Sequence, residues 1–394
     1  MLGVEYMRIN IEERIKKLYV ANPEAKKIVH QIHRLAQKLQ SNFTVIKIMN
    51  FCGTHEWTIS YYGIRSLMPN SIDLVAGPGC PVCITPASYV EELIRLSFEG
   101  YHILTYGDAF RLPARPNSKI RSLAEAKMHG GNISIVYSFL DAIKLARENR
   151  SVNYVFFAIG FETTMAATAE PLFRGSIPKN LLILSAYRLT PPIMKWLLDN
   201  EKDIEIHGVI APGHVSSIIG ANAWRFLVDV YSIPTVVSGF EPVDVLLSIV
   251  FILHQLVKRK FKLVNEYVRV VRDEGNTYAK RLISEVYDIV DSYWRGIGLV
   301  PLSGAVLKDK FSRFDAHKQL GIREYYDAED ILPGCKCREI VLGKAKPIDC
   351  PLFLKICRPD NPYGPCMVGA EGTCRIWAEN PVFLRDSVEL NNIP

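Results

Sequence analysis

The stretch NYVFFAIGFETT occupies residues 153–164 of this 394-residue chain. Its first nine residues form an apolar run of branched and aromatic side chains, which is typical of a buried β-strand. The run passes through a glycine into a polar segment that contains Glu162 and Thr163. We therefore expect a strand here, with a polar loop at its carboxyl end.

The same pattern recurs on both sides of this stretch. Apolar runs alternate with helical segments, such as residues 86–100 and 138–150, and this alternation predicts an α/β fold with mainly parallel sheets. The runs fall into two series of four. The strand candidates are residues 43–51, 71–77, 101–107, 133–138, 153–161, 181–187, 206–213 and 234–240.

Two such series predict two similar α/β domains, residues 43–150 and 151–245. Apolar positions at helical spacing over residues 12–41 predict amphipathic helices, so residues 1–42 are expected to form N-terminal helices that pack with a third domain. Residues 246–394, helical at first and then rich in cysteine and proline, are expected to form that third domain.

Polar loops follow the apolar runs in both series. Ligands of open parallel sheets bind beyond the carboxyl ends of the strands, so these loops are expected to line a cleft. GFETT contributes Glu162 and Thr163, and APGHVS at residues 211–216 contributes His214. Each residue alone is an ordinary helix cap or loop hydrogen bond, and their shared position at strand ends makes them candidates.

Composition excludes several classes of protein. The hydrophobic fraction is 48% and the formal net charge is +6, with no basic cluster interleaved with aromatic residues, so nucleic acid is not an expected partner. The longest apolar run, residues 243–257, is too short to span a membrane. The N-terminus lacks the apolar core of a secretion signal, so we expect a cytoplasmic protein with few structural disulfides.

The nine cysteines are unevenly distributed. Six of them lie in the last sixty residues, at positions 335, 337, 350, 357, 366 and 374. In a reducing compartment this density indicates a metal or cluster site. Irregular spacing with prolines and glycines favours a [4Fe–4S] cluster over zinc, whose sites usually pair cysteines in two short knuckles. The third domain is therefore expected to be a helical, Fe–S cluster-binding domain.

Cys52 and His55 lie in FCGTHEW, directly after a predicted strand. One interpretation is a buried cysteine with a histidine that caps a helix. Another is a thiolate of lowered pKa, favoured by a helix N-terminus or by His55, that binds a soft metal ion. A hydrolytic Cys-His-Glu group is a third.

Cys80 and Cys83 form a C-x-x-C sequence between a predicted strand and a predicted helix. A helix N-terminus stabilises a thiolate, so the pair is typical of a redox-active dithiol. A zinc knuckle completed by Cys52 and His55 is the competing interpretation.

These motifs together resemble the HypD family of [NiFe]-hydrogenase maturation factors. The resemblance extends over nearly the whole chain, with the motifs in the family's order. The matching stretches are CGTHE (52–56), GPGCPVCITP (77–86), YGDAFRLP (106–113), IVYSFLDAIKLA (135–146), FFAIGFETT (156–164), APGHVS (211–216), GFEPVD (239–244) and the terminal CPLF, GPCMV and EGTC segments.

The resemblance implies two α/β domains and a third that holds a [4Fe–4S] cluster. It implies a complex with a small chaperone of the HypC type and cyanide supplied by a donor of the HypE type. The Fe(CN)₂CO group, a transient Fe(II) ion carrying CN and CO ligands, would be assembled on this scaffold and would reach the hydrogenase large subunit indirectly.

Site residues follow from the same resemblance. Cys52 would hold the iron, with His55 as its neighbour, and Cys80 and Cys83 would form the redox pair. Two other functions remain open from the residues, an Fe–S-dependent thiol–disulfide reductase and a zinc-stabilised adaptor. The remaining residues implied are Glu162, Thr163 and His214 in the cleft, and Cys337, Cys350, Cys357 and Cys366 as cluster ligands, with Cys374 in reserve.

Overall fold

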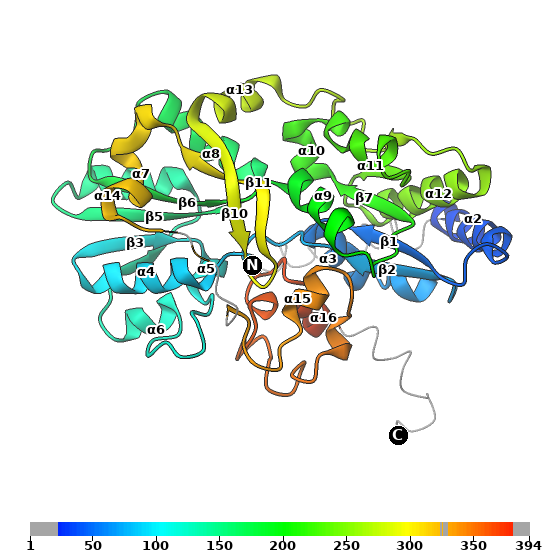
Figure 1. The fold of residues 1–394 in the computed structure, drawn as a ribbon, viewed down its shortest axis with the longest axis horizontal. Helices are drawn as coiled ribbons and strands as arrows, with labels where there is room; N and C mark the ends of the chain where they lie inside the picture. Colours follow the sequence, from blue (N-terminus) through cyan, green and yellow to red (C-terminus); the bar gives the residue numbers. More distant parts are fainter. Residues whose placement is uncertain (1–22, 324, 326–329, 381–394) are drawn as a thin grey trace, which may run out of the picture.

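The computed structural model describes residues 23–323, 325 and 330–380. The described chain contains a five-stranded sheet, a four-stranded sheet and a two-stranded hairpin. In Figure 1 the two larger sheets lie side by side with helices around them, and the hairpin passes between them. The α/β class with mainly parallel sheets is confirmed, and all eight predicted strands are present.

The five-stranded sheet is parallel throughout, in the order β2-β1-β7-β8-β9. Its strands are short and mostly buried on both faces, as expected for parallel strands covered by helices. The strands are β1 (Ile46–Asn50), β2 (Ile72–Ala76), β7 (Gly208–Pro212), β8 (Thr235–Ser238) and β9 (Leu263–Asn265).

The four-stranded sheet is also parallel, in the order β4-β3-β5-β6. The stretch NYVFFAIG is its β5, and seven of its eight residues are buried. The strands are β3 (Tyr101–Thr105), β4 (Ile133–Ile135), β5 (Asn153–Gly160) and β6 (Leu181–Tyr187).

The division of the chain between the sheets differs from the predicted one. The boundary expected at residue 150 falls inside the four-stranded sheet, because β3 pairs with both β4 and β5. The chain begins the five-stranded sheet with β1 and β2, builds the whole four-stranded sheet, and returns at β7, which pairs with β1. One sheet is therefore inserted into the other. The prediction of residues 43–150 and 151–245 as separate α/β units was wrong in this respect.

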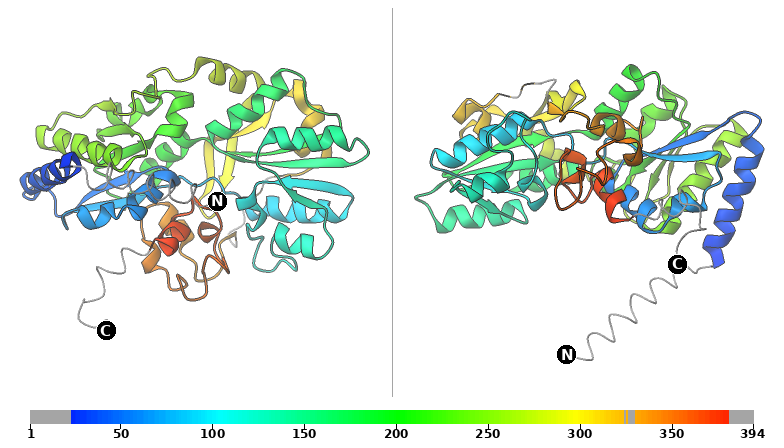
Figure 2. Two further views of the ribbon diagram at one scale, coloured as in Figure 1. Left: turned by 180° about the vertical axis from the view of Figure 1, so that it is seen from behind. Right: turned by 90° about the horizontal axis from the view of Figure 1, so that it is seen from below.

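Helices cover the faces of both sheets, as Figure 2 shows from two further directions. The α-helices before β7 are α2 (Pro23–Leu39), α3 (Gly53–Tyr61), α4 (Ala87–Phe98), α5 (Gly107–Phe110), α6 (Leu123–Met128), α7 (Phe139–Glu148), α8 (Glu162–Phe173) and α9 (Thr190–Asn200). Those after it are α10 (Gly213–Ile219), α11 (Arg225–Asp229), α12 (Pro242–Lys258), α13 (Thr277–Val286), α14 (Ala316–Leu320), α15 (Cys337–Val341) and α16 (Thr373–Glu379).

The amphipathic pattern of the N-terminal region is confirmed by α2. Its apolar face, which includes Ile32, Leu35 and Leu39, packs on α12 in a core shared with the five-stranded sheet. This position is distant from α15 and α16 in Figure 1. The part of the predicted N-terminal helices that precedes residue 23 lies outside the described residues.

A β-hairpin occupies part of the region predicted to be helical. Strands β10 (Tyr287–Trp294) and β11 (Gly298–Leu307) pair antiparallel. They are joined by a tight turn at residues 295–297. The turn reaches the cysteine-rich segment, residues 331–380, which lies beneath the junction of the two sheets in Figure 1. Short 3₁₀ helices, Pro347–Asp349 and Pro365–Met367, alternate there with loops.

No helix in the described part of the chain combines the length and the apolar character that a bilayer crossing requires.

Candidate metal and redox centre

Cys52 occupies the N-cap position of α3, two residues after β1 ends. Burial raises the pKa of its thiol to about 11, and the nearby carboxyl group of Glu371 adds to the increase. Hydrogen bonds from the first backbone N–H groups of α3 lower the pKa but do not compensate. For the free thiol, desolvation therefore outweighs the effect of the helix N-terminus on the pKa.

The C-P-V-C loop lies directly beside Cys52. Cys80 and Cys83 form a disulfide with 5.4 Å between their Cα atoms, and both are buried. Gly79 is packed so closely on Cys52 that an added Cβ would lie 2.6 Å from the Cα of Cys52. The backbone N–H of Gly53 donates to the carbonyl of Gly79 at 3.4 Å. The backbone of Cys52 therefore packs on the loop that contains the Cys80–Cys83 disulfide.

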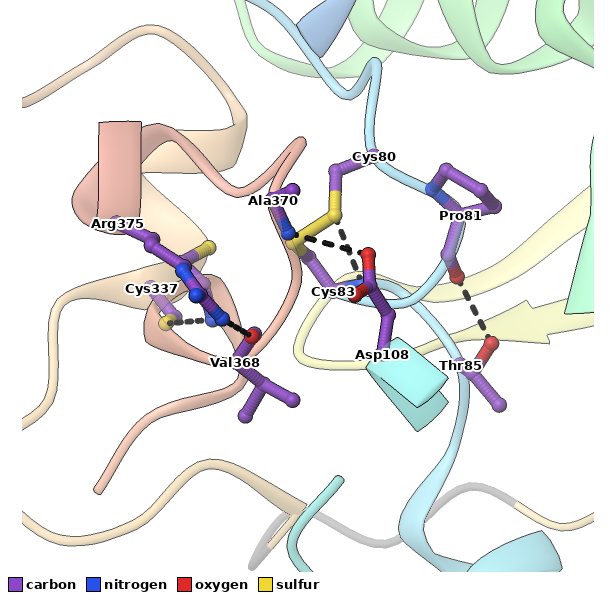
Figure 3. Close-up of a disulfide and its surroundings, with 10 residues drawn as sticks. Cys80, Pro81, Cys83, Thr85, Asp108, Cys337, Val368, Ala370 and Arg375 are labelled. Atoms are coloured by element: carbon purple, nitrogen blue, oxygen red, sulfur yellow. Dashed lines mark hydrogen bonds between the residues drawn. A yellow bond between two sulfur atoms is a disulfide. The ribbon is translucent and has the colours of Figure 1, made fainter. Parts of the chain in front are cut away.

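The loop of residues 367–372, which we call the bridging loop, contacts both the C-P-V-C loop and α3. Ala370 donates its backbone N–H to the carboxylate of Asp108 at 3.1 Å. A Cβ on Gly369 would lie 3.6 Å from the Cβ of Val82, between the two cysteines of the disulfide. Figure 3 shows Ala370 and Asp108 beside the disulfide, with Cys337 behind the loop. The bridging loop therefore connects the C-P-V-C loop and α3, which carry Cys80, Cys83 and Cys52, to the cysteine-rich segment of residues 331–380.

Glu371 is a site residue that the sequence analysis did not single out. A Cβ on Gly53 would lie 2.5 Å from the Cβ of Glu371, so this residue packs on the first turn of α3. Although Glu371 is exposed overall, desolvation of its carboxyl group by the surrounding residues raises its pKa to about 7, and the charge of Asp108 adds to the increase. The only sequence signal is its place in the EGTC segment, because acidic residues in loops are common and most have no role beyond the protein surface.

His55 and His214 lie on either side of Phe240. The ring centroids are 4.6 Å apart for His55 and Phe240, and 3.9 Å apart for His214 and Phe240. The Nε2 atom of His55 lies 2.8 Å from the carbonyl of Gly239, which can only accept, so this nitrogen carries the proton. Burial lowers the pKa of His55 to about 4, and its ring is therefore neutral near pH 7.

The loops that carry Cys52, His214 and Phe240 lie at the same edge of the five-stranded sheet, because β1, β7 and β8 are adjacent parallel strands. Cys52 follows β1, His214 follows β7 and Phe240 follows β8. The predicted placement of the polar loops beyond the carboxyl ends of the strands is confirmed for this sheet.

Glu162 and Thr163 begin α8, which follows β5 of the four-stranded sheet. Glu162 is buried and accepts hydrogen bonds from the backbone N–H and the hydroxyl of Thr190, at 2.8 and 3.2 Å. Burial raises its pKa to about 7, although the bonds from Thr190 oppose the increase. Helix α8 packs against α10, which carries His214. The contacts of Glu162 hold the first residue of α9 and do not reach Cys52.

The rear cysteines gather around Cys337. The thiols of Cys335, Cys366 and Cys374 perturb its pKa and therefore lie within interaction range, and its sulfur accepts the backbone N–H of Cys366 at 3.4 Å. A Cβ on Gly364 would lie 2.6 Å from the sulfur of Cys335, so a glycine is needed beside this group. Cys335 and Cys374, which are not among the four predicted ligands, thus lie near Cys337 together with Cys366.

Cys350 and Cys357 flank the same group. The sulfur of Cys357 accepts the backbone N–H of Gly364 at 3.4 Å, and its pKa is raised by burial and by the charges of Cys335 and Cys350. No disulfide joins any of these six cysteines. Electrostatic interactions thus connect all six cysteines of the segment, which we call the rear cysteine group.

The donor chemistry of this group fits an iron–sulfur cluster. Thiolates are the ligands that such clusters take, and the segment turns on glycines and prolines around them. Within residues 23–323, 325 and 330–380 there is no set of three or more His, Cys, Asp or Glu side chains already arranged around a metal position. Cluster binding therefore requires these side chains to rearrange.

A buried charge network fixes the cysteine-rich segment to α3. Glu56 accepts from Arg65 at 2.8 Å and from Asn50 at 2.9 Å. The indole N–H of Trp377, on α16, donates to the same carboxylate at 2.5 Å. Burial alone would raise the pKa of Glu56, yet the charge of Arg65 and these hydrogen bonds hold it below its ordinary value. Helix α16, and with it Cys374, is thereby held against the helix that begins at Cys52.

Comparison with known proteins finds one family model and several relatives that match this chain. The family model HypD, described as the hydrogenase formation hypA family, matches residues 24–380. A Methanocaldococcus jannaschii protein named for hydrogenase expression and formation is 42% identical over 354 residues, covering 89% of this chain and 96% of the relative.

Two relatives named as hydrogenase maturation factors are similarly close. HypD1 of Bradyrhizobium diazoefficiens is 40% identical over 362 residues, which cover 89% of this chain and 94% of the relative. HypD of Escherichia coli is 37% identical over 336 residues, which cover 84% and 88%. The chain belongs to the HypD family of hydrogenase maturation factors.

Proposed function

We propose that the chain is the scaffold on which the Fe(CN)₂CO group of [NiFe] hydrogenase is assembled. A small chaperone of the HypC type would bind the same Fe(II) ion, a donor of the HypE type would supply cyanide, and the product would pass to the hydrogenase large subunit. The iron is cargo, held by Cys52 and by a partner thiolate, because thiolate sulfur is a soft ligand that suits low-spin iron.

One observation carries this proposal. The bridging loop begins beside Cys366 of the rear cysteine group and ends beside Cys374, and between these points it packs on Gly53 and near Val82 of the C-P-V-C loop. A cluster in the rear group, the disulfide and Cys52 would therefore form a continuous path through packed residues.

The cluster would supply single electrons, which it receives from an external low-potential donor protein. Two electrons and two protons convert the Cys80–Cys83 disulfide into two thiols. Reoxidation of these thiols returns the electron pair and one proton to the cyanide carrier. The carrier–cyanide bond becomes a carrier–hydrogen bond, cyanide leaves as an anion that binds the iron, and the second proton is released.

Burial of the disulfide favours this function over a general thiol–disulfide reductase. Cys80 is 6% exposed and Cys83 is 2% exposed. Exchange with another protein requires an accessible sulfur atom, since a thiolate must attack along the S–S bond. A disulfide that serves an adjacent internal site does not have this requirement.

Infrared spectra of protein co-purified with its small chaperone test the proposal, because bound cyanide and CO absorb where proteins do not. Wild-type protein should show these bands and the brown colour of a cluster. Cys52→Ala should lose the bands and keep the colour. Bands of full intensity in Cys52→Ala would exclude Cys52 as the iron ligand. Colourless wild-type protein that contains zinc would support the adaptor function instead.

A further inference from the structure

The turn of the β10–β11 hairpin carries Arg295, a buried cation with no part in the steps above. It is 2% exposed. Its Nε atom donates to the carbonyl of Asp330 at 2.9 Å, and Nη1 donates to the carbonyl of Pro113 at 2.8 Å. Its third nitrogen, Nη2, is buried without a hydrogen-bond partner. A buried guanidinium with an unsatisfied nitrogen is costly unless negative charge lies close by.

Negative charge near Arg295 can come from Asp330 and from thiols. Burial lowers the pKa of the guanidinium, and the charges that oppose this effect belong to Asp330, Cys337, Cys335 and Cys366, in decreasing order. The cation therefore lies within electrostatic range of three members of the rear cysteine group, and the turn that carries it packs on Arg338, the residue after Cys337, since a Cβ on Gly296 would lie 3.5 Å from the Cβ of Arg338. Interactions between charges are strong in such a buried region, because solvent screening is weak there.

The hairpin turn also contacts the disulfide loop. The backbone N–H of Arg295 donates to the carbonyl of Ile84, the residue after Cys83, at 2.8 Å. Gly296 has a φ of +72°, and an added Cβ would lie 2.8 Å from the side chain of Ile331, at the start of the cysteine-rich segment. Arg295 is therefore held between the two sulfur sites by contacts on both sides.

We propose that Arg295 compensates the negative charge of the rear cysteine group and thereby raises the reduction potential of the cluster bound there. This inference rests on the proposed function, since it requires a cluster. One-electron reduction adds one negative charge to the cluster and its thiolates. A fixed cation close in space stabilises that reduced state more than the oxidised state, in the way that surrounding charges and hydrogen bonds tune such centres.

A purely structural role is the alternative, and Arg188 provides the matched control. Arg188 is 1% exposed and anchors the same hairpin through the carbonyl of Tyr293, at 3.1 and 2.7 Å, and it also donates to the carbonyl of Tyr187, on β6, at 3.1 Å. It resembles Arg295 in burial and in its bonds to backbone carbonyls. A variant of Arg188 therefore reports the effect of weakening the hairpin anchor.

The experiment is a redox titration of anaerobic, cluster-loaded, full-length protein, followed by the visible absorbance and the electron paramagnetic resonance signal of the reduced cluster. Arg295→Gln should shift the midpoint potential to more negative values. We expect the reduced-to-oxidised ratio at a fixed potential to fall about tenfold, which is 59 mV for one electron. Arg295→Lys, which keeps the charge, and Arg188→Gln should stay close to wild type.

Several outcomes would overturn the inference. They are a midpoint potential of Arg295→Gln that equals that of wild type, an equal shift of the potential in Arg188→Gln, and a shift in Arg295→Lys as large as that in Arg295→Gln. If Arg295→Gln does not fold, Arg295→Lys decides, since a retained potential supports the charge role and a more negative one contradicts it. Wild-type protein without a cluster would instead disprove the proposed function, so the two failures are distinguishable.

Discussion

Gly79 lies against the backbone of Cys52 with no space for a side chain, since a Cβ on Gly79 would stand 2.6 Å from both the nitrogen and the Cα of Cys52. This contact sets the distance between the disulfide loop and the cysteine proposed to hold iron. Two loops that follow neighbouring strands of one sheet are thereby held together by backbone contact, without any bond between their sulfur atoms.

Gly79→Ala should destabilise the protein by about 1–3 kcal/mol, because one backbone segment must move away from the other. Urea unfolding measures the change. Gly107→Ala is the control, since an added Cβ there would meet only the side chain of Ile135, at 3.8 Å, and we expect it to change stability by less than about 0.5 kcal/mol. Equal stability of Gly79→Ala and wild type would show that the two loops are not tightly packed.

Glu56→Gln should destabilise the fold by about 3 kcal/mol at pH 7, because it leaves the charge of Arg65 partly buried without its partner. Folding lowers the pKa of Glu56, so its stabilising contribution is complete above the ordinary value of 4.5 and is lost as the pH falls through the lowered folded value. The difference between wild type and variant should therefore shrink in acid.

Urea unfolding of both proteins from pH 7 down to the acid limit of the fold checks this prediction. Glu24→Gln, at an exposed ion pair with Lys27, is the control and should have little effect at any pH. A difference that stays constant as the pH falls below 4.5 would contradict the role given to the charge of Glu56.

Glu162→Gln should change the pH dependence of stability in the opposite direction. Burial raises the folded-state pKa of Glu162 to about 7, from an ordinary value of 4.5. Ionisation is therefore disfavoured in the folded protein, and wild type should lose stability relative to the variant as the pH rises from 4.5 to 7. The loss should reach a few kcal/mol, since each pKa unit corresponds to about 1.4 kcal/mol.

Unfolding of both proteins between pH 5 and pH 8 measures this loss. Glu170→Gln, on an exposed position of the same helix, should show no such trend. If the stability difference between wild type and Glu162→Gln were independent of pH, Glu162 would ionise normally and the burial argument would be wrong.

Glu371→Gln should make Cys52 more reactive. The charge of Glu371 contributes to the raised pKa of the Cys52 thiol, so its removal should increase the thiolate fraction and the alkylation rate at pH 9 by at least about threefold. Mass spectrometry of the peptide that contains Cys52 gives the rate. Glu379→Gln, an exposed carboxylate on α16, is the control. An unchanged alkylation rate would show that the charge of Glu371 has no effect on the thiol of Cys52.

Local sequence signals predicted the strands well but not the order in which they pair. LLILSAY matches β6 at both ends, because a continuous apolar run between turn residues is a local property. The pairing of β7 with β1 depends on which crossover the chain makes after the four-stranded sheet. Nothing in the residues of β7 records that choice, so the boundary at residue 150 followed chain order and was wrong.

The site was predictable where a residue type has few uses. Cysteines that converge from distant segments follow from their number and spacing, and Cys52, Cys80 and Cys83 were selected in this way. Glu371 and Arg295 were not, since a single charged residue in a loop or turn normally faces solvent. The role of Glu371 depends on the packing of the bridging loop on Gly53, and that of Arg295 on its burial in a hairpin that was interpreted as helix.

The central claim is that a cluster in the rear cysteine group reduces the Cys80–Cys83 disulfide beside Cys52. The direct test adds a one-electron reductant, a reduced viologen, to anaerobic protein and counts alkylated Cys80 and Cys83 by mass spectrometry. Both should be alkylated in cluster-loaded protein, while in the cluster-free variant Cys366→Ser the disulfide should persist. Equal reduction in both proteins, or an intact disulfide beside a fully reduced cluster, would contradict the account.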